Sequence, residues 1–363
     1  MKFKIFPPDI NRSKLEFDVP GKKSVGYGLA AIKGVGGSSL EAIVKERQTN
    51  GPYASLTDFA KRINLARIGK KTIELLVQAG ALDSFSKSRD ALVAVIPEMV
   101  KFSDSHHSNK SQGQMLLFED DDVEDNMVDI ASFEQKILES ESQLSQLEWL
   151  LSERKNLGVF LSGHPIDLYE NDSKRFGQLK IKDIPTKVGS KDILIVAFLS
   201  GVSERLTKTN KKMAYIQLED ETGSWETVMF EKDIPDEWPQ TNTVVQAKGS
   251  ISKSYDGTSI NFKLEQIFPL EEIRREMVRS ATIDIHTGKV QDLSKKDIDE
   301  QKKRIKRVAE ILKRYPGKTP VRFHLNYANV KVRIKAEDTG IDLCDGCYQK
   351  IRDLNKENIY IHY

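Results

Sequence analysis

The sequence predicts a multidomain α + β protein with three folded regions: a helical region, a five-stranded barrel and a small α + β domain. Three observations support this fold class. The chain has 363 residues, enough for about two to four domains. Its apolar residues recur with helical spacing near the N-terminus and alternate as in strands in the middle. A polar and acidic stretch, typical of a linker, separates these regions.

Charge and periodicity divide the chain into five segments. Residues 1–102 carry 17 bases and 10 acids, residues 103–148 carry 2 and 12, and residues 271–363 carry 21 and 15. Basic ends joined by an acidic tether favour polyanion binding, although a solvated surface often carries such a surplus. The predicted segments are a helical region (1–102), a flexible acidic linker (103–148), a connecting segment (149–189), a barrel domain (190–270) and an α + β C-terminal domain (271–363).

Glycine-containing turns join short helices in the first region. Residues 24–47 predict a helix, a turn at 34–37 and a second helix, and residues 56–78 predict a similar unit. Such pairs are typical of the helix-hairpin-helix element, in which backbone N–H groups at a helix start face a DNA phosphate. Similar turns also occur in helical proteins that bind nothing. The predicted duplex DNA-binding residues are Lys33, Gly34, Gly36, Arg67, Gly69, Lys70 and Lys71.

Five alternating segments between residues 193 and 264 predict the strands of an oligonucleotide/oligosaccharide-binding (OB) barrel, with a helical insertion before the fourth strand. Two basic turns, 205–212 and 253–257, correspond to the loops that flank the binding face of this fold. The alternative is ordinary hairpins with solvated lysines. The predicted contacts with single-stranded DNA are Arg205, Lys208, Lys211, Lys212 and Tyr255.

The C-terminal domain is predicted from a basic amphipathic helix at 297–315, two strands at 321–336, a helix at 345–354 and a terminal strand. Cys344 and Cys347 have the spacing of metal ligands, but no second such pair exists, so we expect neither a metal site nor a redox role. His164 has no partner of catalytic type and is predicted to be structural.

No combination of residues predicts catalysis, a bound cofactor or a metal. No apolar run is long enough to cross a membrane, and only two cysteines are present, so we expect a cytoplasmic protein with no membrane partner.

A short apolar island lies inside the predicted linker. Polar residues precede it, and seven acids without a base follow between residues 119 and 129. Exposed leucine and phenylalanine side chains favour insertion into the groove of a partner, although folding back onto the chain's own domain is an equal alternative. The island consists of Gln114, Met115, Leu116, Leu117 and Phe118.

The order of these parts resembles the C-terminal third of the alpha subunit of bacterial DNA polymerase III, over essentially the whole chain. The matching stretches are Phe-Pro-Pro-Asp-Ile-Asn (6–11), Tyr-Gly-Leu-Ala-Ala-Ile-Lys-Gly-Val-Gly (27–36), Ala-Gly-Ala-Leu-Asp (79–83) and Leu-Gly-Val-Phe-Leu-Ser-Gly-His-Pro (157–165). The resemblance implies that residues 114–118 bind the sliding clamp. It also implies a fingers segment with helix-hairpin-helix, an OB domain near single-stranded template, and a C-terminal domain that contacts the clamp loader.

In this family, a phosphoesterase-like domain and the catalytic palm precede the part seen here. The resemblance therefore implies a chain that cannot polymerise DNA alone, with Mg²⁺ expected only in the palm. Such a chain would be a recombinant fragment, a split-gene product or a truncated frame. Two functions remain: a non-catalytic polymerase segment that works with its catalytic N-terminal half, or a free-standing adaptor coupling the clamp to single-stranded DNA.

Overall fold

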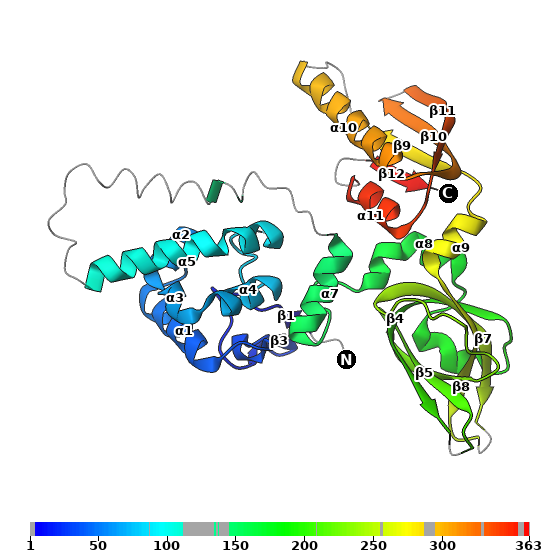
Figure 1. Ribbon diagram of the computed structural model, residues 1–363, viewed down its shortest axis with the longest axis horizontal. Helices are drawn as coiled ribbons and strands as arrows, with labels where there is room; N and C mark the ends of the chain where they lie inside the picture. Colours follow the sequence, from blue (N-terminus) through cyan, green and yellow to red (C-terminus); the bar gives the residue numbers. More distant parts are fainter. Residues whose placement is uncertain are drawn as a thin grey trace. The chain divides into compact units, whose positions relative to one another are not determined.

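The computed structural model divides into two compact units, Met1–Gly163 and His164–Tyr363, which are described separately (Figure 1). No helix in the described part of the chain is both long and apolar enough to span a membrane. The structure describes residues 4–86, 88–111, 134–135, 137, 145–207, 209–254, 257–286, 295–327, 330–354 and 359–362.

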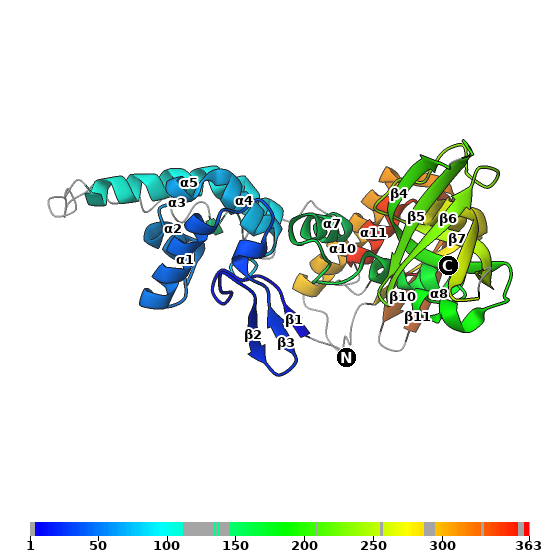
Figure 2. The ribbon, with the colours of Figure 1, turned by 90° about the horizontal axis from the view of Figure 1, so that it is seen from below.

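The first unit is mainly helical, with a small three-stranded sheet beside the helices (Figure 2). The sheet has the order β1-β3-β2, with β1 and β3 parallel. The elements of this first unit are β1 (Lys4–Phe6), β2 (Asp18–Gly21), β3 (Ser24–Gly26), η1 (Leu29–Ala31), α1 (Gly37–Asn50), α2 (Leu56–Arg62), α3 (Leu65–Ile68), α4 (Lys70–Gln78), α5 (Arg89–Ser111) and α7 (Gln146–Leu157).

The second predicted helix pair is confirmed as α2 and α4, joined through the short helix α3. The first pair is partly wrong, because residues 24–26 form a strand and only the single turn η1 precedes the glycine turn. Strand β3 pairs with β1, which lies about 20 residues earlier in the chain, and with β2, which lies across a turn. This pairing overrides the local helical pattern.

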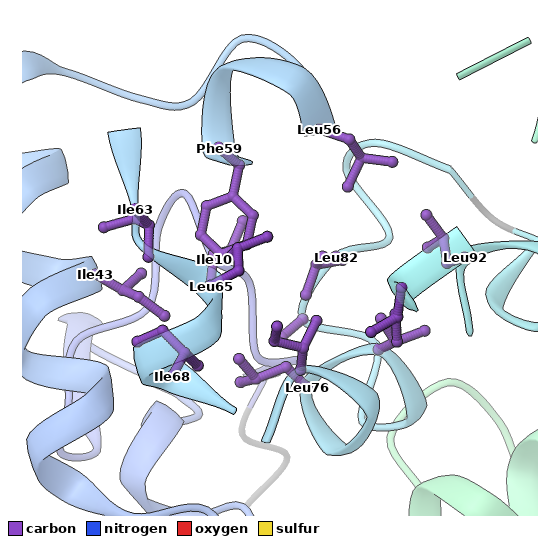
Figure 3. Packing of buried hydrophobic residues seen from close by; sticks show 14 of the residues in the cluster. Ile10, Ile43, Leu56, Phe59, Ile63, Leu65, Ile68, Leu76, Leu82 and Leu92 are labelled. Atoms are coloured by element: carbon purple, nitrogen blue, oxygen red, sulfur yellow. The ribbon is translucent and has the colours of Figure 1, made fainter. Parts of the chain in front are cut away.

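The helices pack around one apolar core (Figure 3). Phe59 and Leu76 are completely buried in it, and Ile43 of α1 joins them. Helix α2 starts where the Ser55 hydroxyl accepts the N–H of Asp58, which is a side-chain cap. The core therefore holds the two glycine turns on a rigid support.

Helix α5 continues through residues 103–111, where we expected regular structure to be lost. Ser103 explains the difference. Its side chain is completely buried, and its hydroxyl donates to the Ile63 carbonyl while accepting the Leu65 N–H. This polar side chain thus anchors α5 by hydrogen-bonding to backbone groups of the turn between α2 and α3. The hydropathy of the sequence does not indicate such an anchor.

The second unit begins with short helices and a five-stranded antiparallel sheet of order β6-β5-β4-β7-β8. This order agrees with the predicted OB topology. The predicted barrel is not closed, however, because no ladder of backbone hydrogen bonds joins the described residues of β6 and β8. Across that seam the Thr227 hydroxyl donates to the Phe262 carbonyl. The elements are η3 (Pro165–Tyr169), α8 (Glu170–Phe176), η4 (Ile181–Lys187), β4 (Ile193–Leu206), β5 (Lys212–Asp220), β6 (Gly223–Phe230), β7 (Thr243–Lys253) and β8 (Ile260–Pro269).

The helical insertion expected before the fourth strand is wrong. Residues 231–242 form turns, and Pro235 and Pro239 within them remove backbone donors that a helix needs. The loop nevertheless covers the sheet, because Ile234 and Trp238 pack against its core. The Trp238 indole donates to Glu204 at 2.6 Å.

The C-terminal part is the predicted α + β fold, with sheet order β11-β10-β9-β12. Strand β9 was not predicted. Burial raises the pKa of the Cys347 thiol to about 12, so this side chain is protonated at neutral pH. The elements are α9 (Leu270–Met277), β9 (Ala281–His286), α10 (Lys295–Arg314), β10 (Pro316–Tyr327), β11 (Val330–Ile341), α11 (Asp345–Asp353) and β12 (Ile359–His362).

Arg274 of α9 joins the OB part to the C-terminal part. Its fully buried guanidinium donates to Asp172 of α8 at 2.6 and 2.9 Å and to the carbonyl of Leu343 and the carboxylate of Asp345. The guanidinium carbon also lies 4.4 Å from the ring centroid of Tyr348. One side chain therefore links residues before and after the five-stranded sheet.

Candidate nucleic-acid interface

Both glycine turns expose the start of a helix. Helix α1 begins after Gly36 and helix α4 after Gly69, and neither is capped by a side chain. The first N–H groups of a helix lack partners within it, so these two helix starts can receive an anion. Among the described residues, a Cβ at Gly36 or Gly69 would meet no atom beyond its chain neighbours within 4 Å, so that part of the structure leaves the space in front of each turn open.

Each turn contains one glycine that its backbone conformation favours, whereas Gly36 is not required for that reason. Gly34 and Gly69 have φ of 81° and 90°, a region that favours glycine. Gly36 has φ of −78°, which any residue can adopt. A side chain at Gly36 would therefore obstruct an approaching ligand without straining the turn. Gly34 also faces Leu75 of α4, at 3.2 Å from an added Cβ, so the first turn lies against the second hairpin's helix.

The predicted cations around these turns are exposed. Arg67 belongs to α3, and Lys70 and Lys71 begin α4. Lys70 lies 3.7 Å from Glu74, and its side chain remains 56% exposed. The backbone N–H of Lys33 donates to Asn156 at the end of α7, which fixes the first turn.

Most other arginines of this unit are structural. Arg62 binds Glu46 through two bonds of 2.6 and 2.8 Å, and Arg89 binds Asp83 through two bonds of the same lengths. Arg47 is buried and donates to two backbone carbonyls. The basic surplus of residues 1–102 thus overstates the cations that can meet a ligand.

The second candidate surface is the outer face of the OB sheet, where β4, β5 and β6 lie side by side (Figure 2). The register places Arg205, Met213 and Phe230 in one row. Tyr215 lies between Ser203 and Val228 in the next row. Alternate residues of β5, such as Ala214, point into the core, so these rows face outward.

Two aromatic rings and a cation therefore share this face, and one of the rings lies beside the cation. Phe230 is 50% exposed, and the Arg205 guanidinium carbon lies 5.4 Å from the ring centroid of Tyr215. Rings on which bases stack, combined with cations for phosphates, are the usual elements of single-strand binding. We name Arg205, Met213, Tyr215, Val228 and Phe230 the OB outer face.

The predicted cations lie at the edge of this face. Lys211 and Lys212 are exposed where the β4–β5 turn enters β5, and Lys212 pairs with Leu206. Lys208 and Tyr255 lie outside the described residues. Tyr215 and Phe230 were missed, although the alternation of β5 around buried Ala214, Ile216 and Leu218 could have identified them.

The remaining candidates lie elsewhere. The island Gln114–Phe118 is outside the described residues. Burial lowers the pKa of His164, whose Nδ1 accepts the Ile166 N–H at the start of η3, so it acts in local structure. Within the described residues, no group of three or more His, Cys, Asp or Glu side chains has the arrangement of a metal site.

Comparison with known families agrees with this geometry. Residues 2–92 match a helix-hairpin-helix motif, and residues 193–270 match an OB-fold nucleic acid binding domain. The chain thus combines two modules of nucleic-acid-binding type.

Similarity to whole proteins gives more specific information than the two family motifs. The DNA polymerase III subunit alpha of Pseudomonas aeruginosa is 30% identical over 100% of this chain, and the match spans 31% of that protein. The subunit of the same name from Escherichia coli K12 is 26% identical over 92% of this chain and 28% of its own length. The resemblance is confirmed: this chain is homologous, along its whole length, to a segment of DNA polymerase III alpha subunits. It spans about a third of the length of these relatives.

Among solved structures, the second OB-fold domain of replication protein A from Methanococcus maripaludis covers 25% of this chain and 92% of its own, at 17% identity and a TM-score of 0.20. That similarity is too low to bear on fold or function.

Proposed function

We propose that this chain is the C-terminal, non-catalytic portion of a replicative polymerase of the DNA polymerase III alpha type, and that it holds DNA and the sliding clamp during replication. One observation carries the proposal: subunits of that name match the entire chain. The two nucleic-acid-binding modules support it, since each presents an open surface suited to DNA.

The two surfaces suit different forms of DNA. Backbone N–H groups in the helix turns that follow Gly36 and Gly69, together with the nearby cations, can reach only phosphates, which repeat identically along a duplex. The hairpins should therefore bind duplex DNA without sequence preference. The OB outer face offers rings and cations to unstacked bases, so we assign it to the single-stranded template.

The partners follow from the same proposal. Catalysis, and any Mg²⁺ that it needs, would belong to the catalytic N-terminal half of the polymerase. Residues 114–118 would bind the sliding clamp, with Gln114 at the rim of its groove and Leu117 and Phe118 inserted as anchors. The C-terminal domain would contact the clamp loader, and the protein would work in the cytoplasm.

The test is a binding assay between this chain, the sliding clamp and the catalytic half, on a primed template. Replacing Leu117 and Phe118 together by Ala should weaken clamp binding by at least about tenfold, because burying each side chain contributes roughly 1.5–3 kcal/mol before ordering costs. Gln112→Ala, just outside the island, is the matched control.

Unchanged clamp affinity by calorimetry would refute the clamp assignment. Binding to clamp and single-stranded DNA without any association with the catalytic half would instead identify a free-standing adaptor.

A further inference from the structure

The four-stranded C-terminal sheet has two unlike faces. On one face, Ala281, Ile283 and Val321 are completely buried. Helices α10 and α11 belong to this part of the fold (Figure 1). Their side chains Val308 and Ile351 are buried. Because side chains alternate along a strand, the residues between these buried ones belong to the opposite face.

The opposite face is basic where β10 pairs with β11. Arg322 lies directly across from Lys335, and His324 lies across from Arg333. Arg322, Arg333 and Lys335 are exposed. Residues two apart on a strand are separated by about 6.8 Å, so these three cations occupy one small area. We name Arg322, Arg333 and Lys335 the basic sheet face.

This arrangement opposes stability. Like charges directly opposite each other on adjacent strands are destabilising. Among the described residues, no carboxylate forms an ion pair with any of the three, whereas His324 pairs with Asp284 at 2.9 Å. Arg275, by contrast, makes two bonds to Asp342, so this domain neutralises an arginine elsewhere.

We propose that the basic sheet face is a further nucleic-acid site, which binds the sugar–phosphate backbone of single-stranded DNA. The phosphates of a single strand would neutralise these three cations, for which the described residues supply no ion pair. An exposed sheet accommodates an extended strand, whereas a duplex groove is usually entered by a helix or a two-stranded ribbon. This site goes beyond the proposed function, which assigns single-stranded DNA to the OB outer face alone.

The experiment uses the full chain and a fluorescent oligothymidine of about 30 nucleotides, longer than one OB domain occupies. The test variant is R322Q/R333Q/K335Q. Its control is K302Q/K303Q/K306Q, which removes the same charge from exposed positions of α10. Both sets are also made in an R205Q/K211Q/K212Q background, so that failure of the OB assignment is seen separately.

We expect the test variant to weaken binding by about fivefold or more at low salt and to reduce the salt slope by about two, because three phosphate contacts are lost. The control should change affinity by less than about twofold. The test variant should melt no lower than the parent, since a like-charge repulsion is removed.

Equal losses in the two triple variants would overturn the proposal, because net charge alone would then explain binding. Unchanged oligonucleotide affinity in the test variant would also overturn it and leave an acidic protein as the partner of this face. If the triple variant does not fold, R333Q alone, compared with K303Q, decides between the same outcomes.

Discussion

The hairpin region and the OB region present different chemistry to a ligand, each on top of an apolar core. At the hairpins the open groups are backbone N–H groups at two uncapped helix starts, and the space before Gly36 and Gly69 is empty. On the OB sheet the groups are side chains, with Arg205 over Tyr215 and Phe230 half exposed. Small residues thus make the first surface, and large residues make the second.

The difference predicts opposite responses to mutation. A backbone surface is damaged by adding atoms, whereas a side-chain surface is damaged by removing them. The structure also separates the arginines of the chain into those that can contact a ligand and those that stabilise the fold.

Arg274→Met should have the largest effect, a loss of about 3–5 kcal/mol in the free energy of unfolding of the second unit, because it leaves buried Asp172 without its charge partner. Arg275→Met, the neighbouring control, removes a partly exposed pair and should cost less than about 1 kcal/mol. Urea unfolding measures both. Equal losses would show that burial does not separate the two arginines.

Tyr215→Ser should weaken single-stranded DNA binding by about 1–3 kcal/mol, or roughly 5- to 150-fold, because a stacking platform is lost. Duplex binding should be unaffected. Tyr215→Phe keeps the ring and should bind normally. Fluorescence anisotropy with both DNA forms measures the contrast, and a normal affinity for Tyr215→Ser would remove this residue from the interface.

Gly36→Val should weaken duplex binding by about fivefold, since an anion at a helix start contributes about 1 kcal/mol. Lys33→Ala should change it by less than about twofold, because it removes one screened charge. The Gly36 variant should fold normally, as its φ of −78° suits any residue. A larger loss for Lys33→Ala, with the Gly36 variant folded, would assign the duplex to surface charge.

The sequence predicted much of the OB sheet and helices α10 and α11 of the C-terminal domain, because strand alternation and helical spacing are local signals. It did not predict β3, β9 or the continuation of α5. Strands of three and six residues depend on partners far along the chain, and Ser103 matters only because Ile63 and Leu65 lie beside it. Hydropathy records none of these relationships.

The candidate site divides in the same way. The glycines and the loop lysines follow from motifs, whereas Tyr215 and Phe230 become candidates only when strand register places them on the same face as Arg205. The sequence also does not show whether a basic side chain is already paired with an acidic one. Arg62 and Lys33 both count as basic residues in the sequence, yet the Arg62 guanidinium forms an ion pair with Glu46.

The position of Arg274 limits how this molecule can be divided by evolution or by proteolysis. A cut after the OB sheet would separate the guanidinium from either Asp172 or Asp345 and expose a charge that now has no contact with water. The OB sheet and the C-terminal sheet should therefore melt in a single calorimetric transition. On this expectation, two architectures that look modular would unfold as one cooperative element.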